Sequence, residues 1–163
     1  MLYKNTIQLV FHISDLHIKS SLERSIINSF NKLINIINEY DKNTSLLVIT
    51  GDIFDSYKDI PSSRSLFGNI LTKLETNEIK TIFIPGNHDF SKNSMSYTIY
   101  DMNVDIDAIS PLFINSRFKY VTYIKDTKSY PLDEENLLHI VSQLDHKTIY
   151  DVIPNKEKKN ILL

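Results

Sequence analysis

Apolar and polar residues alternate along the first ninety positions in segments that predict strands and helices in turn. Residues 6–14 (TIQLVFHIS), 45–49 (SLLVI) and 80–84 (KTIFI) have the patterns of strands, and the apolar run KTIFI indicates a buried one. Between them, residues 21–40 and a segment that begins at Pro61 carry apolar side chains at helical spacing. The order strand, helix, strand, helix, strand predicts an α/β fold with a parallel sheet and right-handed crossovers.

Each predicted helix has one apolar face and recognisable signals at its ends. The faces consist of Leu22, Ile26, Phe30, Leu33 and Ile37 in the first helix, and of Leu66, Phe67, Ile70, Leu71 and Leu74 in the second. Ser20 and Glu23 have the spacing of a capping box, which predicts the start of the first helix. Pro61 suits the first turn of the second helix, and Asn77 suits a left-handed residue after its end.

Beyond residue 90 the periodic pattern weakens. Residues 91–103 are typical of a surface loop, and residues 104–114 favour a short helix. Residues 118–124 and 136–144 alternate between apolar and polar side chains, which predicts strands of a second sheet. The last six residues, KKNILL, form another apolar run that is typical of a strand.

Length, cysteine content and charge limit the class of protein. With 163 residues and no cysteine, residues 1–163 suit a single domain whose core needs no disulfide, and thiol catalysis is excluded. No apolar run has the length of a signal peptide or membrane span, so we expect a soluble intracellular protein, cytoplasmic or nuclear, with no membrane partner. The net charge of −2 does not indicate nucleic-acid binding, and the short basic run at 156–159 (KEKK) is expected to be a solvated loop.

Polar residues follow all three of the first predicted strands. They are SDLH at 14–17, GDIFD at 51–55 and GNHD at 86–89. Because the carboxyl ends of parallel strands share one edge of a sheet, we expect these segments to meet there. Each segment alone is compatible with ordinary turn chemistry. Together they place compatible ligand types at one edge, which favours a functional site.

The residue types in these segments are those of a site for divalent metal ions. Carboxylate, imidazole and amide donors without thiolate suit Mn²⁺, Fe or Zn²⁺. Asp15 and His17 are two positions apart and would face the same ion if the chain stays extended. Asp52 can offer one oxygen to each of two ions, and Asn87 would bind the second. Two ions ~3.5–4 Å apart can activate a water and hold a phosphate.

Residues next to these ligands suggest further roles in the same site. Gly51 and Gly86 permit the positive φ that sharp turns often need. His88 is the expected proton donor to the leaving oxygen of a substrate. Either Asp55 or Asp89 could fix the tautomer of His88 through its other ring nitrogen, and we favour Asp55.

The blocks DLH, GDIFD and GNHD resemble the D-x-H, G-D-x-x-D and G-N-H-D/E signature of calcineurin-like metallophosphoesterases. Their surroundings, FHISDLHI, VITGDIFDS and FIPGNHDF, are most similar to the DNA double-strand-break-repair exonuclease branch, the nuclease subunit of SbcCD-type complexes. The resemblance implies the amino-terminal part of a four-layer α/β/β/α sandwich. It also implies that the first ion is bound by Asp15, His17 and Asp52, the second by Asp52 and Asn87, and that His88 is the catalytic acid, with Asp55 as its partner.

The function that this resemblance implies is metal-dependent hydrolysis of phosphodiester bonds, with DNA as the first candidate substrate and two Mn²⁺ ions, or Fe or Zn²⁺, as cofactors. Similar nucleases employ an ATPase partner subunit and form homodimers, so both are expected by analogy. A phosphatase or phosphodiesterase for small phosphoesters is an alternative, because one fold can serve many substrates.

The sequence departs from the family pattern in its second half. Family members complete the site with a further histidine and a G-H-x-H block, and these 163 residues contain neither. His139 and His146 are the only later histidines, and we expect both of them, and His12, not to be ligands. The sequence therefore predicts an incomplete domain, truncated before the last histidine motifs. A non-catalytic module or one half of a split nuclease is the corresponding alternative function.

Overall fold

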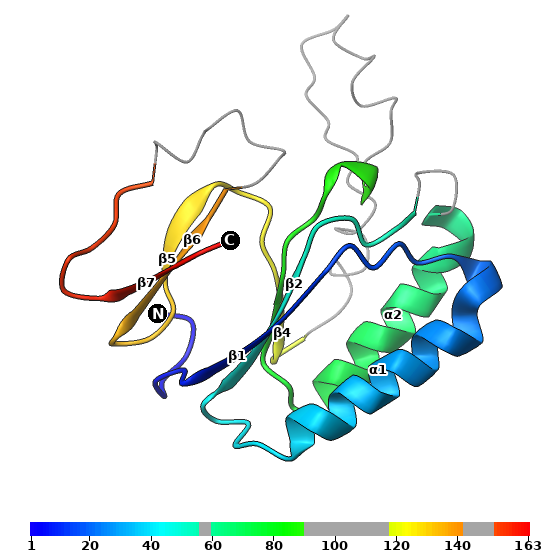
Figure 1. Cartoon of the computed structure of the whole chain (residues 1–163), viewed down its shortest axis with the longest axis horizontal. Coiled ribbons are helices and arrows are strands. Elements are labelled where there is room, and N and C mark those ends of the chain that lie inside the picture. Colours follow the sequence, from blue (N-terminus) through cyan, green and yellow to red (C-terminus); the bar gives the residue numbers. More distant parts are fainter. Residues whose placement is uncertain (56–59, 90–117, 142–151) are drawn as a thin grey trace, which may run out of the picture.

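The computed structural model describes residues 1–55, 60–89, 118–141 and 152–163. In this part of the chain, two helices cover one face of a four-stranded sheet, and a three-stranded sheet lies on the other side (Figure 1). The α/β class and the β-α-β-α-β start are therefore confirmed. No helix among the described residues is both long enough and apolar enough to cross a membrane.

The first sheet is parallel throughout, with strand order β1-β2-β3-β4. Its strands are β1 (Leu9–Ser14), β2 (Ser45–Thr50), β3 (Thr81–Phe83) and β4 (Val121–Tyr123). In β2, Leu47 and Ile49 belong to the core on the helix side, whereas Leu46 and Val48 belong to the core between the sheets. Since both faces of this strand are buried, its sequence is continuously apolar rather than alternating.

Strand β4 corrects one prediction. The alternation over residues 118–124 predicts a strand of the second sheet, but β4 pairs with β3 in the first. Glu75, in the last turn of helix α2 (Ile60–Thr76), accepts the backbone N–H groups of Lys119 and Tyr120 at 2.7 and 2.8 Å. This carboxylate holds the chain beside β3 just before β4 begins. Alternation reveals that a strand has two unlike faces, but not which sheet it joins.

Both helices bury most of the faces that their sequences predict. Helix α1 (Glu23–Asn38) buries Phe30, Ile34 and Ile37, and the whole predicted apolar face of α2 is buried. Of the other predicted residues of this face, Ile26 and Leu33 are partly buried against the same core, whereas Leu22 precedes the helix and is 51% exposed. The two helices thus form one core with the first sheet, which fixes the edge on which the polar segments lie.

Pro61 lies in the first turn of α2, as predicted, but the other two helix-end signals differ from the structure. The residues just before α1 form a short 3₁₀ turn, η1 (Ser20–Leu22), and the N-cap of α1 makes no side-chain capping hydrogen bond, so the capping box does not form. After α2 the left-handed residue is Glu78, with φ 56°, and not Asn77. The side-chain amide of Asn77 instead donates to the carbonyl of Lys73 at 2.8 Å, which satisfies one of the terminal carbonyls.

The second sheet has the order β5-β6-β7. It consists of β5 (Lys128–Pro131), β6 (Asn136–Ile140), which is antiparallel to β5, and β7 (Lys159–Leu162), which is parallel to β6. Leu138 and Ile140 of β6 pack in the core between the two sheets. The strand predictions within 136–144 and for the last residues are confirmed, whereas the helix predicted at 104–114 lies outside the described residues.

A buried carboxylate, Asp133, ties the amino-terminal segment to the second sheet. It accepts backbone N–H groups from Ile7 at 2.8 Å and from Glu135 and Asn136 at 2.9 Å. The side-chain amide of Asn136 also donates to it, at 2.8 Å. Burial acts to raise the pKa of Asp133, but these hydrogen bonds outweigh burial and the pKa is lowered.

Candidate metal centre

The polar segments after β1, β2 and β3 meet at one edge of the first sheet, as their order predicts. Backbone pairing continues past the ends of β1 and β2: the N–H of Asp15 donates to the carbonyl of Thr50 at 3.1 Å, and that of His17 to the carbonyl of Asp52 at 3.2 Å. The N–H of His88, after β3, donates to Asp52 Oδ1 at 2.9 Å. Asp52 therefore contacts the segments on both sides of its own.

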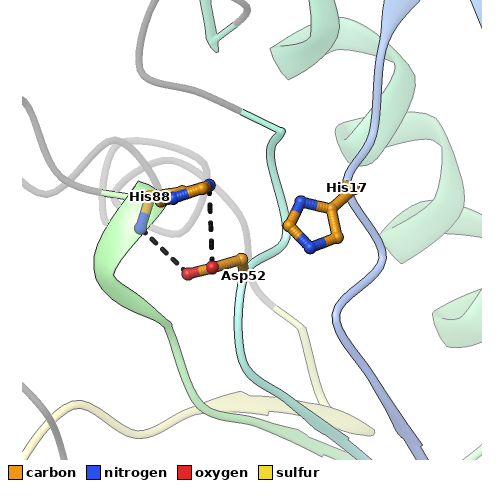
Figure 2. A group of neighbouring side chains, drawn as sticks. All are labelled: His17, Asp52 and His88. Carbon is orange, nitrogen blue, oxygen red and sulfur yellow. Dashed lines mark hydrogen bonds and ion pairs between the residues drawn. The ribbon is translucent and has the colours of Figure 1, made fainter.

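His17, Asp52 and His88 form the candidate metal centre. One ligand atom from each of these three residues, here called the trio, lies within 4.8 Å of the others. The two imidazole side chains flank the Asp52 carboxylate (Figure 2). Asp52 is buried, whereas each histidine side chain is 41% exposed. The trio thus combines a shielded anionic oxygen with two imidazoles that are open to solvent on one side.

The trio fits a divalent cation. Nδ1 of His88 is shielded from solvent and has no hydrogen-bond partner, and it faces Asp52 Oδ2 at 3.6 Å. A buried polar atom without a partner costs about 1–3 kcal/mol, so such atoms in native proteins need an explanation. A cation held between imidazole nitrogen and carboxylate oxygen satisfies both groups. Two imidazoles and a carboxylate suit Zn²⁺, Mn²⁺ or Fe.

Both glycines of the site are required, but for different reasons. Gly51 has φ 80°, as predicted, and a Cβ there would lie 2.9 Å from Asp15 Oδ1. Gly86 does not have a positive φ, so that prediction is wrong. A Cβ at Gly86 would overlap the Asp52 carboxylate and lie 2.5 Å from the Asp52 nitrogen. Gly86 therefore allows the turn after β3 to approach Asp52 closely.

Two of the predicted ligands are not in the trio. Asp15 is exposed, and both it and His17 have positive φ values, of 51° and 45°. The chain is therefore not extended here, and the argument that extension turns both side chains to one ion does not hold. Non-glycine residues in this region are strained, and such strain gathers at functional sites. The backbone of Asn87 lies in a 3₁₀ turn, η2 (Asn87–Asp89), but its side chain lies outside what the structure describes. Ligation by Asp15 and Asn87 stays a prediction.

Asp55 contacts Lys19 and His17. Its Oδ2 lies 2.9 Å from Lys19 Nζ, and its Oδ1 lies 3.7 Å from His17 Nδ1. The hydrogen bond from Lys19 is the main reason that the pKa of Asp55 is lowered. The carboxylate that faces the ring of His88 is that of Asp52. These contacts do not include His88, so the predicted pairing of Asp55 with His88 stays a prediction.

Asp89 is a buried link between two turns of the site. Its Oδ1 accepts the backbone N–H groups of Ile53 and Phe54, both at 3.0 Å, and its Oδ2 accepts that of Gly86 at 2.8 Å. Burial raises the pKa of Asp89 to about 6 in spite of these bonds. Because backbone groups engage both oxygens, Asp89 fixes the turn after β2 against the turn after β3. The sequence suggested Asp89 only as a partner for His88. A carboxylate that accepts backbone N–H groups has no sequence pattern by which it can be recognised.

Two further histidines in the described part of the chain, His12 and His139, do not belong to the trio. His12 Nε2 shares a hydrogen bond of 2.7 Å with Thr50 Oγ1. His139 is buried, and both of its ring nitrogens are hydrogen-bonded, to Ser129 Oγ at 2.7 Å and to Asn160 Oδ1 at 2.8 Å. Both ring nitrogens of His139 are thus engaged, in agreement with the prediction that His139 is not a ligand. His146 lies outside the described residues.

Comparison with known proteins identifies the family of this chain. The calcineurin-like phosphoesterase family matches residues 9–162, so the chain belongs to that family, whose members are metal-dependent phosphoester hydrolases in general. The chain is also 30% identical over 132 residues to "Uncharacterized protein R555" of Acanthamoeba polyphaga mimivirus, in an alignment that covers 78% of this chain. The chain spans 9% of the length of that relative.

Proposed function

We propose that this chain forms the metal-binding part of a phosphodiesterase that acts on DNA. The observation that carries the proposal is the trio at the carboxyl edge of the parallel sheet, with a carboxylate and a shielded imidazole nitrogen that face each other at 3.6 Å. Family membership supports the hydrolysis of phosphoesters. The similarity of the three motif blocks to DNA double-strand-break-repair exonucleases supports DNA as the substrate.

The chain's own residues have separate tasks in this reaction. Asp52, His17, Asp15 and Asn87 hold the cations, with Mn²⁺ as the first candidate. Bound divalent cations supply an activated water and neutralise charge on the phosphate. His88 donates a proton to the leaving oxygen. Its side chain is 41% exposed, so its ring can reach a substrate, while its backbone N–H stays anchored to Asp52.

The sequence and the geometry thus assign two different roles to His88. The sequence predicts a proton donor, whereas the trio contains its ring as a candidate ligand. A general acid contributes about 10²–10⁴-fold to the rate without holding the ion. A ligand contributes mainly to metal affinity. Replacement of His88 separates the two, because rate and affinity are measured independently.

The direct test is Mn²⁺-dependent cleavage of linear DNA and of a small chromogenic phosphodiester, alongside a Mn²⁺ titration of the same protein. We expect the wild type to bind Mn²⁺ and to cleave both substrates until the metal is chelated. If His88 is the proton donor, His88→Asn should keep the metal and lose about 10²–10⁴-fold in turnover; a loss of Mn²⁺ affinity would instead assign His88 as a ligand. His139→Asn serves as a control, because His139 lies in the second sheet, away from the trio.

Two outcomes would favour other functions. Efficient turnover of the small diester without cleavage of DNA would indicate an enzyme for small phosphoesters. Tight metal binding without turnover of either substrate would indicate a metal-binding module that needs another polypeptide for catalysis. The three closely spaced ligand atoms of the trio support metal binding under either candidate.

A further inference from the structure

Asp55 connects an ammonium group with a histidine of the trio. Lys19 Nζ lies 2.9 Å from one carboxylate oxygen, and His17 Nδ1 lies 3.7 Å from the other. The backbone holds this arrangement in register, because Ile18 and Phe54 form a parallel bridge immediately before Lys19 and Asp55. The N–H of Ile18 also donates to the carbonyl of Ile53 at 2.8 Å. The contact between the two side chains thus follows from paired backbone.

The ring nitrogen of His17 that faces Asp55 is poised for a hydrogen bond. His17 Nδ1 is shielded from solvent and has no hydrogen-bond partner. A separation of 3.7 Å is too long for a hydrogen bond, but a small rotation of the ring or of the carboxylate would close it. Histidines that bind metals usually donate their second ring N–H to a carboxylate, which fixes the tautomer and the orientation of the ring.

We propose that Asp55 is the positioning residue of His17: it accepts the Nδ1–H of the ring, leaves Nε2 for the cation, and is itself held by Lys19. This inference rests on the metal-binding part of the proposed function. It replaces the pairing of Asp55 with His88 that the family resemblance implies. Lys19 carried no signal in the sequence, because its partner lies 36 positions away and in another turn.

The relay from Lys19 through Asp55 to His17 predicts graded effects on metal affinity. Asp55→Ala removes the acceptor and should weaken Mn²⁺ binding about 10–100-fold. Asp55→Asn keeps an oxygen that accepts the Nδ1–H, so it should restore most of this loss. Lys19→Met keeps the Asp55 carboxylate but removes the ammonium group that positions it. It should therefore weaken Mn²⁺ binding, but less than Asp55→Ala does.

A matched control separates this relay from a general loss of surface charge. Lys159, in the second sheet, forms an ion pair with Glu135 at 3.5 Å, and both side chains of this pair are exposed. Lys159→Met should leave Mn²⁺ affinity unchanged. Because Lys19 and Asp55 are themselves partly exposed, we expect circular dichroism and the melting temperature of all variants to stay close to those of the wild type.

The decisive experiment combines Mn²⁺ titration of these variants with ¹⁵N NMR of the histidine rings in the Zn²⁺-bound protein. In the wild type, Nδ1 of His17 should carry the proton and Nε2 should bind the metal. In Asp55→Ala this pattern should change for His17 and not for His88. Equal affinity in all variants, or a change at His88 alone, would overturn the inference while leaving metal binding intact. A wild type that binds neither ion would overturn both the inference and the proposed function.

Discussion

At the scale of single residues, the site is centred on Asp52. Its Oδ1 accepts the N–H of His88, its Oδ2 faces the ring of His88, and its carbonyl accepts the N–H of His17. The backbone N–H groups of both histidines of the trio therefore hold them to Asp52. The carboxylate supplies the one formal negative charge of the trio, which sets how strongly a cation is held.

Asp52→Asn tests this role. An amide has nearly the same shape as the carboxylate and still offers one acceptor, so the fold should persist and the metal-free melting temperature should stay within a few degrees. Affinity for Mn²⁺ should fall about 100-fold or more, because the attraction between opposite charges is lost. Calorimetric titration measures the affinity. Unchanged affinity would show that Asp52 does not hold the ion.

Asp89→Asn tests the link between the turns. An amide nitrogen would face either the N–H of Gly86 or those of Ile53 and Phe54, and leaving such a buried donor unsatisfied costs about 1–3 kcal/mol. We expect urea denaturation to show this loss, together with weaker Mn²⁺ binding. Asp133→Asn is the matched control: it also removes a buried acceptor of backbone N–H groups, but in the second sheet. A variant of Asp89 that loses stability and keeps full metal affinity would disprove its role in the site.

At the scale of elements, the sequence predicted best where burial leaves a strong pattern. Strand β2 is buried on both faces, and the apolar face of α2 is completely buried, so the apolar pattern of each element was enough to predict it. Signals that depend on one hydrogen bond failed more often. The capping box before α1 did not form, and the left-handed position after α2 moved by one residue. Strand β4 was placed in the wrong sheet because Glu75, which holds the preceding chain, lies 44 positions before Lys119.

Glu75→Ala should loosen β4. The change removes the acceptor of the Lys119 and Tyr120 N–H groups, which are exposed and half-buried, so we expect a loss of about 0.5–1.5 kcal/mol of unfolding free energy. Hydrogen exchange should speed up at Thr81, whose N–H donates to the carbonyl of Tyr120 at 2.8 Å. Glu157→Ala, in an exposed turn, should change neither quantity. Normal protection at Thr81 in Glu75→Ala would argue against this anchor.

At the scale of the whole molecule, β2 joins two cores. Alternate residues of β2 pack against the helices and against the second sheet, so the site at its carboxyl end is supported from both sides. The parallel order of β1, β2 and β3 was enough to predict that the three polar segments meet. It was not enough to predict side-chain partners within the site. The position of Asp55 beside His17, and of Asp89 under both turns, depends on turn geometry that composition and periodicity do not encode.

The pH dependence of stability should reveal how the second sheet is attached. The pKa of Asp133 is lowered from its usual 3.8 in the folded protein, so the unfolded chain binds a proton at a higher pH than the folded chain does. The stabilisation is therefore complete above the unfolded value and is lost as the pH falls through the lower folded value. As the pH is lowered below ~4, the unfolding free energy of the wild type should fall more steeply than that of Asp133→Asn. Equal slopes would contradict the anchoring role of Asp133.

The most direct test of the central claim is a crystal structure of the chain soaked with Zn²⁺ or Mn²⁺, with anomalous scattering used to locate the ion. The trio predicts an anomalous peak among His17, Asp52 and His88, within about 2.0–2.2 Å of nitrogen and oxygen ligands if the ion is Zn²⁺. A strong peak elsewhere, or full soaking without any peak at the trio, would contradict the account.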